Sequence, residues 1–139
     1  MKRILFLLTF LLCGLVASSQ VRSQTDQVDG VETVNFDISA SGNYAAIGID
    51  VLFTEVGGTT DGWVALLARN GSGAAWQKLP KATWSGISYN SALDSLQITD
   101  GASHKIKIEN PAFSNYRVRV IGTSGDTTSV TVRYNYRKY

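Results

Sequence analysis

The sequence predicts an all-β protein: a single-domain antiparallel β-sandwich, jelly-roll-like, with about eight or nine strands after an N-terminal signal peptide. Three observations predict this fold. Short runs of alternating apolar and polar residues recur along the chain, turn signals rich in glycine, asparagine and aspartate separate them, and no amphipathic stretch is long enough for a helix. A length of 139 residues suits one ordinary domain. A small closed barrel is the alternative that these patterns do not separate from a sandwich.

The N-terminus has the three-part pattern of a secretory signal peptide. Met1-Lys2-Arg3 carries positive charge, residues 4–16 are mostly apolar, and residues 17–19 are small. Cleavage removes the signal peptide 1–19 and makes Gln20 the new N-terminus. The apolar run is shorter than the roughly 20 residues of a membrane span. We therefore expect a secreted, periplasmic or cell-surface protein with no membrane attachment after cleavage, a retained anchor being the alternative.

The chain has one cysteine, Cys13, which lies inside the expected signal peptide. Leu12 precedes it, whereas the signals of bacterial lipoproteins have a small residue at that position, so lipidation is the lesser alternative. After cleavage no cysteine remains, which excludes a disulfide and thiol chemistry. The mature domain must therefore be stabilised by burial of its core.

The first half of the mature chain predicts a leader and three strands. Residues 20–32 are polar and have no period, which indicates a flexible leader before a β-sandwich domain at 33–139. Apolar residues alternate with polar ones over 34–38 and again over 45–53, as in half-buried strands. Residues 63–68 are apolar at every position, which suits a strand covered on both faces.

The middle of the chain is less regular. A short strand at 76–79 ends at Pro80, and the segment 83–89 is ambiguous. Short alternating runs then predict strands at 96–98 and 105–108, the second of which ends at Asn110-Pro111.

The last two runs of alternation, 115–122 and 129–137, flank a short connection that contains glycine and predict a β-hairpin. Their apolar positions form the expected core face: Tyr116, Val118, Val120, Val130, Val132, Tyr134 and Tyr136. The opposite face of this hairpin carries arginine.

Cationic side chains are the most distinctive feature of the C-terminal part. Residues 101–139 hold seven basic and two acidic residues, whereas 20–100 hold four basic and nine acidic ones. If the last strands are neighbours, six cations share one sheet face: Lys105, Lys107, Arg117, Arg119, Arg133 and Arg137. Like charges in this arrangement repel each other unless an anionic partner lies against them.

Two interpretations of this cationic face stay open. It is either a solvated face that protects a sheet edge, or a binding surface. The partners it would fit are protein subunits, including the acid-rich half of a second copy in a homo-oligomer, or an anionic cell-surface polysaccharide. Nucleic acid is not expected, because the protein is exported and the mature chain has as many acidic as basic residues.

Catalytic chemistry is not indicated. His104 is the only histidine, which excludes a histidine–cysteine dyad in the mature chain and a zinc site of several histidines. No glycine-rich phosphate loop or spaced calcium loop is present. The sequence therefore predicts no enzyme activity, no metal and no cofactor, with a calcium ion held by loop acids such as Asp61 or Asp100 as the lesser alternative.

Aromatic residues in the middle of the chain offer a second kind of binding surface. Trp84 and Tyr89 lie among serine, glycine and asparagine, where an exposed ring can stack on the apolar face of a sugar. Trp63 and Trp76 flank a turn and are expected to close the core instead. These observations lead to one hypothesis, a secreted carbohydrate-binding module.

Five segments of the chain carry a family resemblance: Gly58 to Leu66, Arg69 to Gly73, Trp76 to Leu79, Tyr116 to Val120 and Ser124 to Val132. Together they resemble a loose class of small β-sandwich proteins of tailed bacteriophages. The resemblance covers about two-thirds of the mature chain and implies a virion-associated role as a fibre or decoration component, in contact with the host surface or with other virion subunits. The expected signal peptide is a departure from that class, whose members assemble in the cytoplasm.

Overall fold

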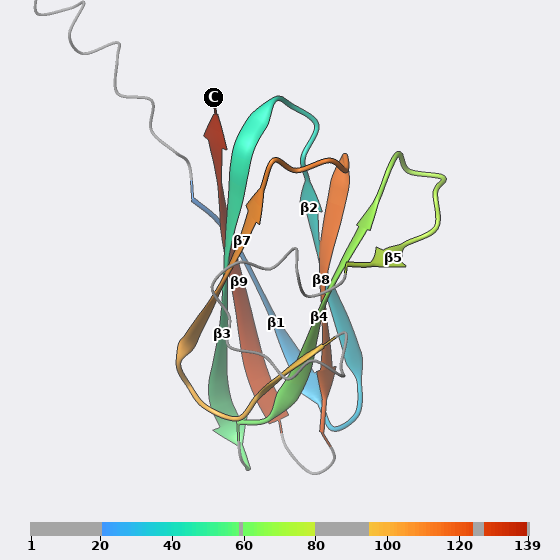
Figure 1. Cartoon of the computed structure of the whole chain (residues 1–139). Coiled ribbons are helices and arrows are strands. Elements are labelled where there is room, and N and C mark those ends of the chain that lie inside the picture. Colours follow the sequence, from blue (N-terminus) through green and yellow to red (C-terminus); the bar gives the residue numbers. More distant parts are fainter. Residues whose placement is uncertain (1–20, 59, 80–94, 124–126, 139) are drawn as a thin grey trace, which may run out of the picture.

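The computed structural model describes residues 21–58, 60–79, 95–123 and 127–138. In these ranges the chain forms nine strands and no helix, and Figure 1 shows how they are arranged. Their bounds are β1 Arg22–Asp29, β2 Thr33–Ser39, β3 Tyr44–Gly57, β4 Gly62–Arg69, β5 Gln77–Lys78, β6 Leu96–Ile98, β7 Ser103–Glu109, β8 Asn115–Gly122 and β9 Thr127–Lys138. Within the same residues, no helix has the length and hydrophobicity to cross a membrane. The expected signal peptide and the ambiguous segment 83–89 lie outside the described residues.

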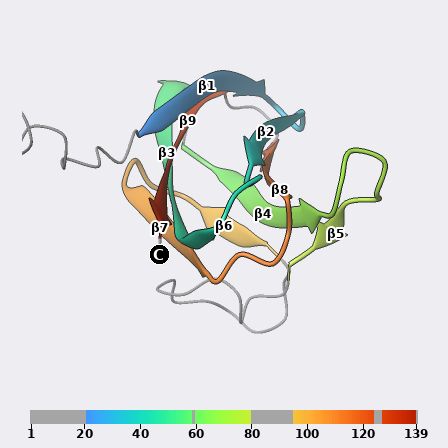
Figure 2. The same ribbon diagram turned by 90° about the horizontal axis from the view of Figure 1, so that it is seen from above.

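The strands form two antiparallel sheets. Sheet A has the order β1-β9-β3-β7, and sheet B has the order β2-β8-β4-β5, with β6 also paired to β4. Figures 1 and 2 show the sheets as two facing layers. Consecutive strands lie in different sheets apart from the β4–β5–β6 segment, which is the winding of a jelly roll. The predicted all-β sandwich is therefore confirmed.

Strands β5 and β6 together occupy the place of one strand. β5 pairs with the end of β4 at Leu67 and Ala68, and β6 pairs with its beginning at Gly62 to Val64. Both are antiparallel to β4 and lie on the side of β4 opposite β8. The nine labelled strands thus fill the eight positions of a jelly roll.

The core lies between the inner faces of the two sheets. Val118 in β8 and Val132 in β9 are 0% exposed. The inward side chains predicted for both strands are buried, apart from the half-buried Tyr136. The main contributors from the other strands are Phe36, Ile38, Ile47, Ile49, Val51, Phe53, Val64, Leu66, Ile106 and Ile108. In β4 the outward Ala65 and Leu67 are buried as well, so the prediction of a strand covered on both faces is confirmed.

The predicted C-terminal hairpin is wrong. β8 pairs with β2 and β4, whereas β9 pairs with β1 and β3, so the two strands belong to different sheets. Alternation identifies which residues of a strand face inward, but two strands that face each other across the core have the same pattern as two that pair side by side.

The expected flexible leader at 20–32 is also corrected by the structure. Residues 22–29 form β1 and pair with β9 over their whole length, from Arg22 opposite Tyr134 to Asp29 opposite Thr127. This edge strand has one buried side chain, Val28. A single inward apolar residue gives no visible period, which explains why the sequence did not indicate a strand. The β-sandwich therefore includes β1.

The turn after β1 is held against the end of β8 by a close backbone approach. The Gly122 amide donates a hydrogen bond to the Glu32 carbonyl at 3.0 Å. A Cβ at residue 122 would lie 2.1 Å from the Gly30 carbonyl oxygen, so only glycine fits there. This contact ties the lower end of β1 in sheet A to β8 in sheet B.

We expect Val118→Asp or Val132→Asp to unfold the domain. Either change places an unpaired charge between the sheets at a cost of several kcal/mol, which is comparable with a total stability of about 5–15 kcal/mol. Arg119→Ser, on the solvent side of β8, should change the melting temperature little. Thermal melts of the three variants check this, and an equal loss from Arg119→Ser would contradict the assignment of the two faces.

Candidate functional site

The six predicted cations do not share one face. Arg117 and Arg119 lie on the outer face of sheet B, because β8 belongs to that sheet. The other four, Lys105, Lys107, Arg133 and Arg137, lie on the outer face of sheet A, on β7 and β9. The prediction of a single cationic face is therefore wrong, because it required β8 and β9 to be neighbours in one sheet. Two separate surfaces replace it.

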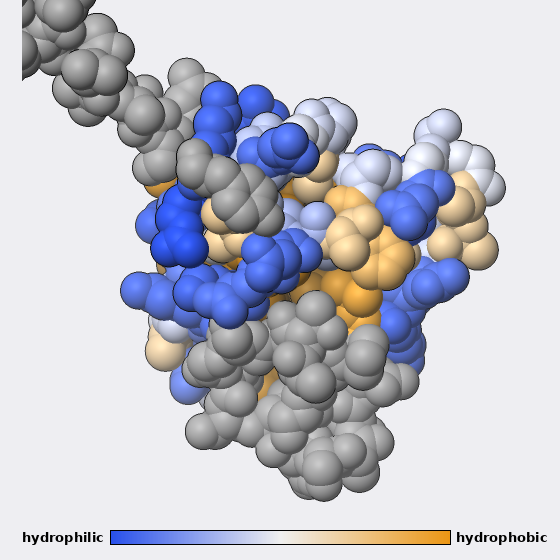
Figure 3. Space-filling model, turned by 45° about the horizontal axis from the view of Figure 1, so that its top comes forward, coloured by the Kyte–Doolittle hydropathy of each residue, from blue (hydrophilic) through white to orange (hydrophobic). Residues whose placement is uncertain are grey.

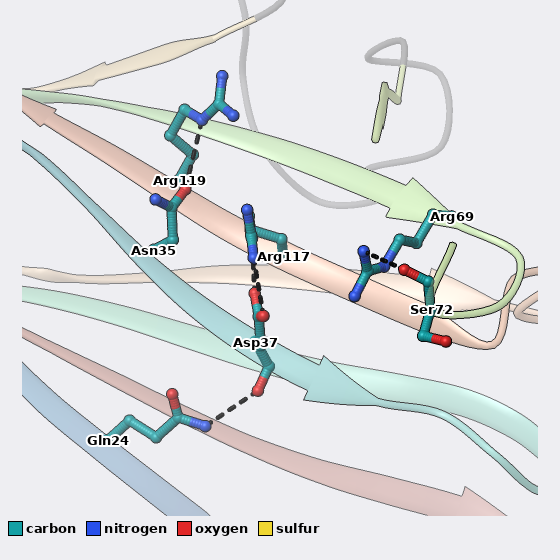
Figure 4. Close-up of polar contacts among 7 residues, drawn as sticks. All are labelled: Gln24, Asn35, Asp37, Arg69, Ser72, Arg117 and Arg119. Atoms are coloured by element: carbon teal, nitrogen blue, oxygen red, sulfur yellow. Dashed lines mark hydrogen bonds and ion pairs between the residues drawn. The ribbon is translucent and has the colours of Figure 1, made fainter. Parts of the chain in front are cut away.

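On sheet B, Arg117 is held by a paired carboxylate. Its Nε and Nη2 atoms donate hydrogen bonds of 2.6 and 2.8 Å to the two carboxylate oxygens of Asp37, which lies opposite it on β2. The Arg117 hydrogen bond lowers the pKa of Asp37 from its ordinary value, and the Asp37 carboxylate raises that of Arg117. Figure 4 shows this pair, together with the hydrogen bond from the Gln24 side chain of β1 to the Asp37 carbonyl.

Trp76 lies between two guanidinium groups on the same face. The Cζ atom of Arg69 is 4.3 Å and that of Arg117 is 4.2 Å from the centre of the indole ring. Arg69 also donates a hydrogen bond of 2.9 Å to the Ser72 carbonyl, which is drawn in Figure 4. Trp76 is therefore neither the core residue expected from the sequence nor an open stacking platform. It fixes the β4–β5 loop to the outer face of sheet B through cation–π contacts.

Arg119 also has a neutral partner on sheet B. Its Nε donates a hydrogen bond of 3.3 Å to the Asn35 side-chain oxygen, as Figure 4 shows. Each of these three arginines thus makes at least one contact with the protein itself.

Sheet A has a shallow depression on its outer face. Its volume is about 290 Å³, and its polar lining comes from three adjacent strands, β7, β3 and β9. The strand register places the outward residues in two rows. One row is Lys105, Asp50 and Arg133, and the next is Lys107, Gly48 and Asn135. Gly48 therefore leaves a gap at the centre of the second row.

The absence of a side chain at residue 48 also determines where the Asn135 amide lies. A Cβ at this position would be 2.4 Å from the Asn135 Oδ1 atom. The amide thus lies over the Gly48 backbone, where it forms part of the depression. Asn135 offers one hydrogen-bond acceptor and two donors to a ligand there.

The charges around the depression are only partly balanced within the described structure. Lys107 forms an ion pair with Glu109, and Arg137 also contributes to lowering the pKa of that carboxyl group. Lys105 and Arg133 are exposed, flank Asp50 across the sheet, and make no ion pair with any residue that the structure describes. This row combines two cations with one carboxylate at strand spacing, about 4.8 Å apart.

The polar side chains around the depression are donors and acceptors of hydrogen bonds. No group of three or more metal-binding side chains converges in the described ranges. His104 lies next to β3 and its Nε2 atom is 2.7 Å from a carboxylate oxygen of Asp100, an arrangement local to the β6–β7 turn. Lysine, arginine, aspartate and asparagine side chains are suited to hydrogen bonds with an anionic, hydroxylated ligand.

Sequence reasoning found the cations but missed three members of this site. Asp50, Gly48 and Asn135 all lie at outward positions of strands, and the alternation of β3 and β9 could have identified their faces. Only the pairing of β3 with both β7 and β9 brings them beside Lys105 and Arg133. Trp84 and Tyr89, the predicted stacking residues, lie outside the described residues.

Several acidic residues lie elsewhere, in turns and at strand ends that Figure 1 shows at the lower end of the sandwich. The turns and strand ends there carry Asp29, Glu32, Glu55, Asp61 and Asp100. Lys105, Lys107 and Arg133 lie opposite Asp50 and Gly48, in the middle part of β3. Figure 3 turns the upper end forward and shows hydrophilic side chains over much of it, with a hydrophobic area between them.

Comparison of the sequence with protein-family models and with curated proteins gives no match. Among solved structures, the chain is similar to PirA, with 12% identity, a TM-score of 0.51, and coverage of 88% of this chain and 99% of PirA. A de novo designed double-stranded β-helix has 12% identity, a TM-score of 0.44, and coverage of 81% and 97%. The Yersinia pseudotuberculosis-derived mitogen has 14% identity, a TM-score of 0.45, and coverage of 84% and 86%.

These similarities concern the fold alone, because the identities are low. None of the three proteins is a phage fibre or decoration protein. The family resemblance noted in the sequence is thus supported only as a general resemblance between β folds.

We expect Asp37→Asn to destabilise the domain by up to about 1 kcal/mol near pH 6, the range of exposed ion pairs. Because the pKa of Asp37 is lowered in the folded state, its contribution is present above the unfolded pKa of about 3.9 and is lost as pH falls through the folded value. The difference from the wild type should therefore shrink toward pH 2. Urea unfolding at both pH values measures it, with Asp29→Asn as an exposed carboxylate control; a difference independent of pH would contradict the ion pair.

Proposed function

We propose that the protein is an exported, non-enzymatic binding protein that attaches to an anionic surface polysaccharide through the depression on sheet A. The observation that carries this proposal is the pair of exposed cations, Lys105 and Arg133, that flank the depression without an ion-pair partner among the described residues. Two such charges about two strands apart attract an anionic polymer over the whole face.

The size of the depression also supports a small ligand. A volume of about 290 Å³ is at the lower limit of small-molecule sites, about 300–1,000 Å³, and suits one residue of a longer polymer. Its position on the rigid, paired strands of sheet A fixes the polar groups relative to each other.

The jelly-roll fold is compatible with this function and with the virion role that the sequence resemblance implies. Jelly rolls occur in lectins and in viral capsid proteins alike, so the fold does not choose between them. We propose attachment to a surface as the activity, with a virion surface component as one setting for it and a secreted carbohydrate-binding module as the other. Neighbouring genes would discriminate the settings: capsid and tail genes favour the first, genes for polysaccharide degradation the second.

We expect the double variant Lys105→Ser/Arg133→Ser to bind polygalacturonate about tenfold more weakly than the wild type at low salt, a loss of about 1.4 kcal/mol. The matched control Arg119→Ser/Lys138→Ser removes the same net charge outside the depression and should bind nearly as well as the wild type. Wild-type binding should weaken as salt rises from 0.01 to 0.15 M, because the screening length falls from about 30 to about 8 Å. Biolayer interferometry on the immobilised polymer measures all of these.

Equal losses in the two double variants would show that only net charge matters, and would contradict a site in the depression. Trp84→Ala tests the alternative of sugar stacking. If it alone abolishes binding, and binding is independent of salt, the ligand contacts the segment 80–94 instead of sheet A.

Gly48→Ala tests the site without changing any charge. The new Cβ would clash with the Asn135 amide, which must move away, while the flexibility of that half-buried side chain keeps the cost to the fold small. We expect an unchanged melting temperature within about 2 °C and at least a threefold loss of polygalacturonate affinity, measured by the same method. Unchanged affinity would show that the ligand does not enter the gap above residue 48.

A further inference from the structure

Asp50 is the unexpected member of the cationic depression. It lies on β3 directly between Arg133 of β9 and Lys105 of β7 in the strand register. A carboxylate at the centre of a cationic surface weakens the attraction of that surface for polyanions, because like charges repel. Its presence therefore limits which anions can bind.

The hydrogen-bonding chemistry of a carboxylate explains which anions can bind beside Asp50. An ionised aspartate accepts hydrogen bonds and donates none. A ligand group that lies against Asp50 must therefore supply a donor, such as a hydroxyl. Sulfate esters and the side chains of acidic peptides present acceptor oxygens only, so their approach to Asp50 is unfavourable.

The neighbouring groups have the complementary preference. Arg133 and Lys105 donate hydrogen bonds and favour an anionic group beside each of them, while the half-buried Asn135 amide can donate and accept. The row thus alternates between donor, acceptor and donor across three adjacent strands. A matching ligand carries an anionic group and a hydroxyl group a few Å apart on one rigid unit.

We infer that the depression selects a carboxylated sugar, such as a uronic acid residue within a polysaccharide, with its carboxylate at Arg133 or Lys105 and a ring hydroxyl at Asp50. This inference rests on the proposed function and specifies its ligand. Asp50 acts as the specificity-determining residue, because it rejects anions that carry no hydroxyl. The two cations determine affinity for anions in general.

The test measures the binding of the full mature chain to three immobilised polyanions: polygalacturonate, with carboxylates and hydroxyls; polyacrylate, with carboxylates and no hydrogen-bond donor; and polyvinyl sulfate, with sulfate esters and no hydrogen-bond donor. The wild type should bind polygalacturonate at least tenfold more tightly than the other two at equal ionic strength. Asp50→Asn keeps the size of the side chain and adds a donor. It should strengthen binding to polyacrylate and polyvinyl sulfate at least fivefold and leave binding to polygalacturonate within twofold.

The matched control is Asp29→Asn, which removes one negative charge from the lower end and should not change the order of the three polymers. Equal binding of the wild type to all three polyanions, or an equal gain for all three in Asp50→Asn, would overturn the selection while leaving attachment to anions intact. No binding of the wild type to any of them would overturn the proposed function as well. A melting temperature for Asp50→Asn close to that of the wild type verifies that the fold is retained.

Discussion

Burial of the two inner sheet faces against each other is the constraint on which the rest of the structure depends. The inner residues of β3, β4, β8 and β9 are almost completely removed from water, and each large aliphatic side chain contributes about 1.5–3 kcal/mol when fully buried. The expected mature chain contains no cysteine, so no disulfide supplements this burial. The outer faces contribute less to stability, and their side chains are free to serve other purposes.

The jelly-roll winding decides which of those outer side chains meet. Because β8 and β9 enter different sheets, arginines that are close in sequence are separated onto opposite surfaces of the molecule. Sheet B engages its arginines internally, through Asp37, Asn35 and Trp76. Sheet A leaves Lys105 and Arg133 beside Asp50. The same residue type therefore has a structural role on one face and a candidate binding role on the other.

Much of the fold could be predicted from the sequence, because alternation reports directly on which side of a strand is buried. Val118, Val132 and the inward residues of β3 were assigned in this way, and their burial confirms it. Pairing between strands has no such local signal. The sequence therefore did not reveal that β8 and β9 face each other across the core, nor that β3 lies between β7 and β9 and brings Asp50 and Gly48 into the depression.

β1 was missed for a related reason. As an edge strand it buries only Val28 and is held mainly by backbone pairing to β9, which every residue type except proline can provide. Gln24 adds a side-chain hydrogen bond to the Asp37 carbonyl of sheet B. Neither interaction produces a hydrophobic pattern.

Trp76 is the opposite case, a large aromatic residue that suggests a core position in the sequence. In the structure it is held on the surface by Arg69 and Arg117.

The jelly-roll topology also determines where the acidic and basic parts of the sequence lie on the molecule. Strands run alternately up and down, so turns from distant parts of the chain meet at the lower end, and their acids gather there: Asp29, Glu32, Glu55, Asp61 and Asp100. Lys105, Lys107 and Arg133 lie above them on sheet A. Under the proposed function, a polyanion is repelled from the acidic end and attracted to sheet A, so the electrostatic field of the protein orients it toward the depression before any contact forms. In this proposal, long-range charge brings the ligand to sheet A, and Asp50 acts only at contact, where hydrogen-bond donors and acceptors distinguish one anion from another.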